Sequence, residues 1–306
     1  SLKIFPTEKT KPIAFNYGVA SGDPTNSNVI LWTKISGGDL KDKKIIWEVS
    51  NQKSFQKILV SGNAKAKFDD NFTVKVDAQI PSTFNGKKIY YRFSCQGILS
   101  DVGTTQTLPI HNPNKFNIAF CSCSNYPAGY FNAYKEMAND EEIDLVLHLG
   151  DYLYEYSREG YASSDAKRMN RVVNPPNEIV TLEDYRTRYA TYRSDKDLQL
   201  LHKSKPMIAV WDDHEITNDT WKKGAQNHSP NEGLFNVRKN NAIKAYYEWM
   251  PIRDSKQKEK IWRKFTVGTL INLIMLDTRL YGRDKQLEIS SYIEGEILNK
   301  EEYRKD

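Results

Sequence analysis

The sequence has little cysteine, with three residues in 306, and this excludes the small folds that disulfide bridges hold together. No apolar run approaches the roughly 20 residues needed to cross a bilayer, so we expect no transmembrane helix. Residues 1–30 lack the basic, apolar and small-residue pattern of a signal peptide. The protein is therefore expected to be cytosolic, or to have lost a targeting peptide before this numbering begins.

A strong charge of one sign is also absent. The 44 lysines and arginines exceed the 39 acidic residues by only five, which is too small an excess to indicate a nucleic-acid-binding protein but would not repel an anionic substrate. Aromatic residues, at 12%, are too frequent for a disordered chain. The length favours two domains of about 150 residues each.

Short apolar and alternating runs separated by turn residues occupy the first part of the chain. The runs are Val29–Thr33, Ile45–Val49, the alternation from Phe72 to Val76, and Ile89–Phe93. This pattern predicts a small antiparallel β-sandwich over residues 1–110. Residues 109–114, which contain two prolines and two asparagines, indicate a linker, and we expect residues 1–108 to add no strand to the following domain.

Strand and helix patterns alternate in residues 115–306, which predicts an α/β domain with a largely parallel sheet. We expect strands at 116–121, 145–149, 207–211 and 270–276, and helices at 130–138, 182–192 and 237–250. The strand at 116–121 is expected to be buried. Residues 157–180 lack a clear period and predict a long loop beside the site.

Polar side chains follow each expected strand, where α/β sheets bind their ligands. The four runs are Cys121–Tyr126, Gly150–Glu155, Asp212–Asn218 and Asp277–Arg279. Helix capping explains one aspartate at each junction, but it explains poorly two adjacent acids followed by histidine and asparagine. Carboxylate and amide oxygens suit hard cations, and thiolate with phenolate suits ferric iron, so we predict a metal site.

Several motifs resemble PhoD-type alkaline phosphatases and occur in the order of that family. They are Gly18–Pro24, Val29–Thr33, Ser122–Tyr126, His148–Glu155, Asp184–Tyr189, Trp211–Glu215, Tyr246–Arg253 and Met275–Arg279. The resemblance implies an N-terminal β-sandwich followed by a calcineurin-like metallophosphatase α/β domain. It also implies hydrolysis of phosphate monoesters and diesters by a secreted, periplasmic or cell-surface enzyme that holds ferric iron and calcium.

Matching the family motifs residue by residue implies a set of metal ligands, which is Cys123, Asp151, Tyr154, Asp212, Asp213 and Asn218. Asp151 is then the bridging ligand. The family commonly has one cysteine after the first strand, whereas this chain has two. A strand period of two would place Cys121 and Cys123 on one face, and position in the motif favours Cys123 as the ligand.

The family's remaining ligands lie in a C-terminal Asp/His segment, and this sequence ends before such a segment. The expectation is an incomplete metallophosphatase domain that binds metal weakly and turns over phosphate esters poorly when residues 1–306 are expressed alone. The four other histidines offer no clear replacement; they are His111, His148, His202 and His228. His148 lies in an apolar run and is expected to be a hydrogen-bonded core residue.

The expected reaction is in-line attack of a metal-activated water on a small-molecule phosphate ester. Arg158 is a candidate phosphate contact. His214 is a candidate acid for the leaving group, or it only orients hydrogen bonds around the ligands. Two alternatives stay open, a phospholipase D-like phosphodiesterase on the same scaffold and a non-catalytic cell-surface binding module. Neither a nucleic-acid partner nor an oligomeric state is predicted.

Overall fold

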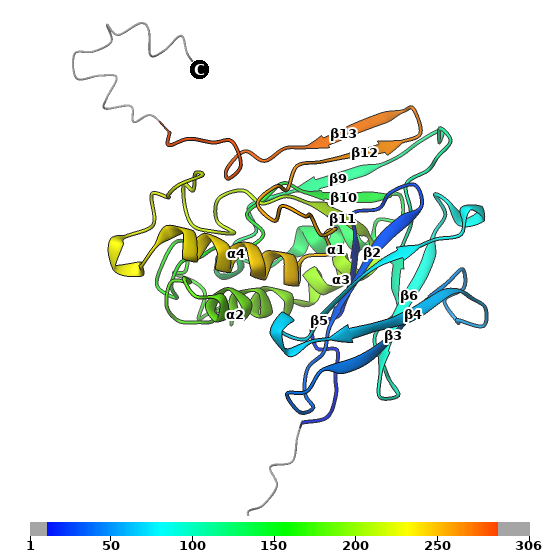
Figure 1. The fold of residues 1–306 in the computed structure, drawn as a ribbon, viewed down its shortest axis with the longest axis horizontal. Helices are drawn as coiled ribbons and strands as arrows, with labels where there is room; N and C mark the ends of the chain where they lie inside the picture. The colour runs from blue at the N-terminus through cyan, green and yellow to red at the C-terminus, as the bar shows by residue number, and fades with distance from the viewer. Residues whose placement is uncertain (1–10, 287–306) are drawn as a thin grey trace, which may run out of the picture.

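The computed structural model describes residues 11–286, in which a six-stranded sheet forms one layer of a β-sandwich at one end and packs against helices at the other (Figure 1). The strands of the first part are β1 Val19–Gly22, β2 Asn28–Lys34, β3 Lys43–Ser50, β4 Ile58–Ala66, β5 Thr73–Gln79, β6 Ile89–Cys95, β7 Ile98–Leu99 and β8 Gly103–Thr105. The later strands are β9 Ile118–Cys121, β10 Leu145–His148, β11 Pro206–Ala209, β12 Arg263–Val267 and β13 Ile271–Met275. The helices are α1 Asn132–Asn139, α2 Leu182–Arg193, α3 Lys196–Ser204 and α4 Phe235–Trp249.

The predicted β-sandwich is present. One layer is the antiparallel set β5-β2-β1, and the other is β4-β3-β6-β7 with β8 paired to β6. Alternate side chains of β2, Val29 and Leu31, pack with Trp47, Val49 and other buried residues between the layers. Burial of these side chains supplies the hydrophobic free energy that holds the two layers together.

The sandwich shares its first sheet with the α/β part, so the expectation that residues 1–108 add no strand there is wrong. Strand β1 runs parallel to β11, with Ser21 opposite Pro206, and the sheet continues through β10 to β9. The reason is that β1 and β2 are buried on both faces. Val29 and Leu31 enter the sandwich core, whereas Ala20 and Trp32 enter the α/β core. This double burial produces a continuous apolar run rather than an alternating one.

The helices pack in pairs, α1 with α3 and α2 with α4, and lie below strands β9–β11 in the view of Figure 1. Thr181 begins α2 with a capping box, in which its side chain accepts from the Asp184 N–H. At the end of α4, Trp249 lies 6.0 Å from Trp32, ring centre to ring centre. The Trp32 indole donates to the Glu248 carbonyl at 2.7 Å, which fixes α4 against the shared sheet.

Two of the expected strands differ from the prediction. Strand β9 begins at Ile118 and forms the edge of the described sheet, where Phe120 is 70% exposed rather than buried. Strand β13 pairs antiparallel with β12 in a separate two-stranded sheet instead of joining the parallel strands. A turn closed by the Leu270 N–H and the Val267 carbonyl joins β12 directly to β13, and a parallel pairing would need a long crossover there.

The long loop predicted at 157–180 is confirmed, since neither helix nor strand forms between β10 and α2. Arg158 donates to the Val173 carbonyl within the loop. Arg188 of α2 donates to the Asn174 carbonyl and so attaches the loop to that helix. Among residues 11–286, no helix combines the length and apolar character that spanning a membrane requires.

Candidate metal centre

The carboxyl ends of β10 and β11 meet at Gly150. Its φ is +108°, and a Cβ there would lie 2.4 Å from the Asp212 nitrogen, so only glycine fits this approach of the two chains. The next residue, Asp151, also has a positive φ of 54°, which aspartate tolerates better than most residues. The tight turn therefore places Asp151 beside the residues that follow β11.

Five of the predicted site residues converge at this point. Asp151, Asp213 and His214 each offer a ligand atom, and these atoms lie within 4.8 Å of one another. The Cys123 sulfur lies 3.3 Å from Asp151 Oδ2, and the Tyr154 hydroxyl lies 3.4 Å from the same oxygen. A candidate metal site thus exists at the strand ends.

The electrostatics of the group fit a bound cation. Burial raises the pKa of Asp151, with a further contribution from the negative charge of Asp212, and burial also raises the pKa of Asp213 to about 6. Burial followed by the charge of Asp151 raises the pKa of Tyr154, and the Cys123 thiol shifts in the same direction for the same two reasons. These four groups resist ionising at the same time, because their negative charges would repel one another. A multiply charged cation among them would offset that repulsion.

Glu155 holds His214 from behind. Its fully buried carboxylate lies 2.7 Å from His214 Nδ1 and also accepts from the Asn218 N–H and the Asn227 amide. Burial opposes ionisation of Glu155, but the hydrogen bond and charge of His214 outweigh it and lower the pKa of the carboxyl. Burial also opposes the charged form of His214, yet Glu155 raises its pKa to about 9. The sequence reasoning missed Glu155, whose only signal was its place at the end of the Gly150–Glu155 run.

Asp212 lies outside the compact group and faces Arg279. The Arg279 Nε and Nη2 atoms lie 2.6 and 3.0 Å from the two Asp212 oxygens, and Nη2 lies 3.3 Å from Asp213. Burial tends to raise the pKa of Asp212, but the hydrogen bonds and charge of Arg279 outweigh this and lower it. In the sequence, Arg279 is only a polar residue after the last expected strand. Its partners lie more than 60 positions earlier, so no local pattern could reveal the ion pair.

Two other predicted residues make different contacts. Asn218 donates its side-chain amide to Gln226 at 2.9 Å. Arg158 donates to the Val173 carbonyl and the Asn174 side chain, within its own loop. Within residues 11–286, neither side chain forms a hydrogen bond with Asp151 or Asp213.

The two neighbouring cysteines do not share a face, contrary to the strand argument. Strand β9 ends at Cys121, and Cys123 has left the strand with a φ of +59°. Cys121 points toward the Leu147 carbonyl, and burial raises its pKa to about 12. Cys123 is exposed and lies against Asp151, so its position, unlike that of Cys121, is compatible with metal binding.

His148 is a hydrogen-bonded core residue, as predicted. It is fully buried, and its Nε2 lies 3.0 Å from the Tyr134 hydroxyl and 3.3 Å from Ser124 Oγ. Burial lowers the pKa of His148 to about 3, which keeps the imidazole neutral. His202 is likewise buried, against the Tyr152 hydroxyl at 2.8 Å. Neither histidine belongs to the candidate metal centre.

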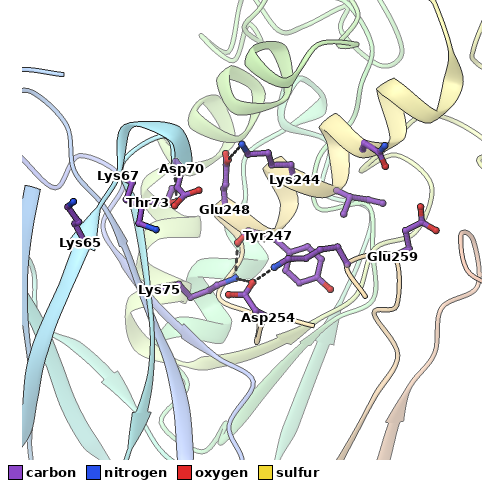
Figure 2. Close-up of a pocket in the computed structure, with 13 residues that line it drawn as sticks. Lys65, Lys67, Asp70, Thr73, Lys75, Lys244, Tyr247, Glu248, Asp254 and Glu259 are labelled. Carbon is purple, nitrogen blue, oxygen red and sulfur yellow. Dashed lines mark hydrogen bonds and ion pairs between the residues drawn. The ribbon is translucent and has the colours of Figure 1, made fainter. Parts of the chain in front are cut away.

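A cavity of about 620 Å³ lies elsewhere, between the β4–β5 region and α4 (Figure 2). Five lysines and four acidic residues line it, and many of these charges compensate one another. Figure 2 shows Lys75 between the Tyr247 carbonyl and Asp254, each at 2.9 Å. None of the candidate metal ligands lines this cavity, so its size does not identify the site of chemistry.

Carboxylate, thiol, phenol and imidazole groups at the ends of parallel strands are typical of metal-dependent hydrolases of the α/β class. Comparison with known proteins identifies the family. The PhoD-like phosphatase family matches residues 118–305, and its N-terminal domain matches residues 3–109. The chain belongs to the PhoD-like phosphatase family.

Two relatives show the extent of the likeness. Alkaline phosphatase D of Bacillus subtilis (strain 168) is 41% identical over 285 residues, which are 89% of this chain and 48% of that protein. A solved structure described as the structure of PhoD superposes with a TM-score of 0.82 at 39% identity, covering 93% of this chain and 55% of that one. This chain therefore spans about half the length of the relatives it matches.

Proposed function

We propose that the protein hydrolyses phosphate monoesters and diesters in a metal-dependent reaction. The observation that carries this proposal is the convergence of Asp151 and Asp213 with the Cys123 thiol and the Tyr154 phenol at the strand ends, beside His214, in a member of a phosphatase family. We also propose a secreted, periplasmic or cell-surface location and a small-molecule phosphate ester as substrate, the substrate class being supported by the description of the matched relative as an alkaline phosphatase.

The donor types support ferric iron together with calcium. Cys123 and Tyr154 are anionic donors that favour a trivalent, strongly Lewis-acidic ion, and Asp151 lies between them and the remaining acids. Asp213, Asp212 and the Asn218 amide are oxygen donors of the type that calcium prefers. Asp212 would ligate while both of its oxygens accept from Arg279, and Asn218 would ligate through its Oδ1, because its Nδ2 donates to Gln226.

Bound metal ions would supply an activated water nucleophile and positive charge for the phosphoryl oxygens. Glu155 holds the His214 ring in one orientation and favours its protonated form, so His214 is positioned to give a proton to the leaving oxygen. Arg158 has Nε and Nη2 anchored in the loop, which leaves Nη1 as the predicted phosphate contact.

The first test is metal-dependent phosphate release. Residues 1–306 alone are expected to release phosphate only slowly from a soluble monoester, to lose this activity on dialysis against a chelator, and to regain it with ferric iron and calcium. Relative rates on a monoester and on a phosphatidyl diester separate this activity from a phospholipase D-like one. No turnover with any metal, together with no metal uptake, would favour the non-catalytic binding module.

The two cysteines offer a matched test of the metal's identity. Cys123→Ser replaces a thiolate with a poor donor, so we expect loss of bound iron, of visible absorbance and of most activity. Cys121→Ser is expected to do far less, because Cys121 contacts the Leu147 carbonyl instead of the acids. Iron content, absorbance and phosphate release are measured in both variants. If iron is lost only in Cys121→Ser, the ligand assignment is wrong by two residues.

A further inference from the structure

Two tyrosines from the segment after β10 pack against the His214 ring, and a third packs against both of them. The ring centres of Tyr154 and Tyr156 lie 4.2 and 5.5 Å from that of His214. Tyr161 continues the series outward, because its ring lies 6.1 Å from Tyr154 at an interplanar angle of 24° and 5.8 Å from Tyr156. The aromatic ladder, defined as Tyr154, Tyr156 and Tyr161, thus leads from the candidate metal centre toward solvent.

The outer member of the ladder is held in place although it is 62% exposed. Its carbonyl accepts from the Asn125 amide at 3.4 Å, which ties the loop to the chain that follows β9. A turn just before it is closed by the Gly160 N–H and the Ser157 carbonyl at 3.0 Å, and Ser163 Oγ donates back to the Gly160 carbonyl. Backbone contacts therefore fix the position of Tyr161 while most of its ring faces water.

An exposed ring at a fixed position beside a reaction centre can bind a second ring by stacking. Proteins that hold nucleobases on aromatic side chains gain affinity from such stacking whatever the base, because every base has a π face. Tyr154 already covers one side of Tyr161, so a ligand ring would lie on the exposed part of Tyr161 or against its edge. The phosphate of the same ligand would then lie deeper, toward Asp151 and Asp213.

We propose that Tyr161 binds the alcohol part of the substrate by stacking, so that the site favours phosphate esters whose alcohol carries a planar aromatic ring. The proposal rests on the phosphate ester hydrolysis proposed above. Stacking recognises a planar π surface, which either a nucleobase or a simple aryl ring provides. The ring is a specificity group and takes no part in proton transfer.

The test uses pairs of substrates with the same type of leaving oxygen. Adenosine 5′-monophosphate is compared with ribose 5-phosphate, and benzyl phosphate with cyclohexylmethyl phosphate. For Tyr161→Ala, we expect the ratio of kcat/KM for the nucleotide to that for ribose 5-phosphate to fall about tenfold, through KM rather than kcat. Tyr161→Phe should keep the wild-type ratio, since it retains the ring.

Phe68 provides the control, because it is an exposed aromatic residue of the sandwich with 51% of its surface accessible. Phe68→Ala should leave both ratios unchanged. A response of the nucleotide pair alone assigns the site to a nucleobase, and a response of both pairs assigns it to planar rings in general. An equal loss on all four substrates in Tyr161→Ala would overturn the proposal, because it would show a structural role in the loop.

Ligand binding separates this proposal from the hydrolysis itself. Saturation-transfer NMR of the wild-type protein should show contact with the adenine protons of adenosine 5′-monophosphate, and the signal should fall in Tyr161→Ala. If no substrate is hydrolysed but this signal is present, the proposed function fails and the stacking site stands. If phosphate is released yet the adenine signal is the same in both proteins, the stacking site is refuted.

Discussion

Asp151→Asn is expected to lower phosphate release about a thousandfold, since it removes a charge worth several kcal/mol at a metal centre. Asp151 is the residue around which the site is built: Cys123 and Tyr154 lie against one of its oxygens, and the His214 N–H lies 3.4 Å from the other. Asparagine keeps the shape and also tolerates the left-handed backbone at φ +54°. The expected loss is therefore one of metal charge balance and not of folding.

Unfolding measurements separate these two causes. Burial and the neighbouring Asp212 raise the pKa of Asp151, so the ionised carboxylate is unfavourable without a metal ion. The metal-free Asp151→Asn protein should accordingly be at least as stable as the metal-free wild type at neutral pH. Asp101→Asn, at an exposed salt bridge, serves as the control and should change neither activity nor stability. A metal-free Asp151→Asn protein that unfolds more easily would contradict this account.

Local sequence predicted much of the fold because most of the strands and helices are determined by short-range patterns. The apolar run of β10 and the helical spacing of the α2 tyrosines both appear where expected. The sharing of a sheet by the two parts was not predicted. It depends on the pairing of Ser21 with Pro206, 185 positions later, and no local pattern carries that information.

For the candidate site, too, the sequence predicted some residues and missed others. Residues at strand ends, such as Asp151 and Asp213, were predictable because the carboxyl ends of parallel strands meet at one edge. Groups that act through distant partners were not: Glu155 contacts His214 across 59 positions, and Arg279 reaches Asp212 across 67. Cys123, which its position in the motif favoured as the ligand, lies against Asp151, but its assignment as a ligand stays a prediction. The strand-period argument failed because β9 ends at Cys121.

The junction between the sandwich and the α/β core centres on Asp23, which is fully buried just after β1. Its Oδ2 accepts the Arg253 N–H at 2.7 Å, and its Oδ1 lies 2.9 Å from Arg263 Nη2. The Asp23 carbonyl accepts from Arg253 Nη1, and the Asp23 N–H donates to the Met207 carbonyl at 3.1 Å. One residue thus joins β1 to β11 and to the chain after α4.

Asp23→Ala is expected to lower the free energy of unfolding by about 3–5 kcal/mol, the usual cost of removing one partner of a buried ion pair. It leaves the Arg263 guanidinium, whose side chain is 16% exposed, without its carboxylate, and it places alanine at a φ of +41°. Asp23→Asn should cost less than Asp23→Ala, because it keeps an acceptor oxygen and a side chain that tolerates this backbone. Chemical unfolding followed by far-ultraviolet circular dichroism gives these values.

Asp77→Asn is the matched control, because Asp77 makes two 2.8 Å contacts with the same Arg253 but its side chain is 43% exposed. Solvent screens such a pair, so the expected loss is below about 1 kcal/mol. If Asp77→Asn and Asp23→Asn prove equally costly, burial at the junction is not what makes Asp23 important. The expected result is that Asp23→Ala lowers stability and Asp77→Asn does not. The buried Asp23 carboxylate then holds the sandwich to the strands that carry the candidate metal centre, through the sheet that both parts share.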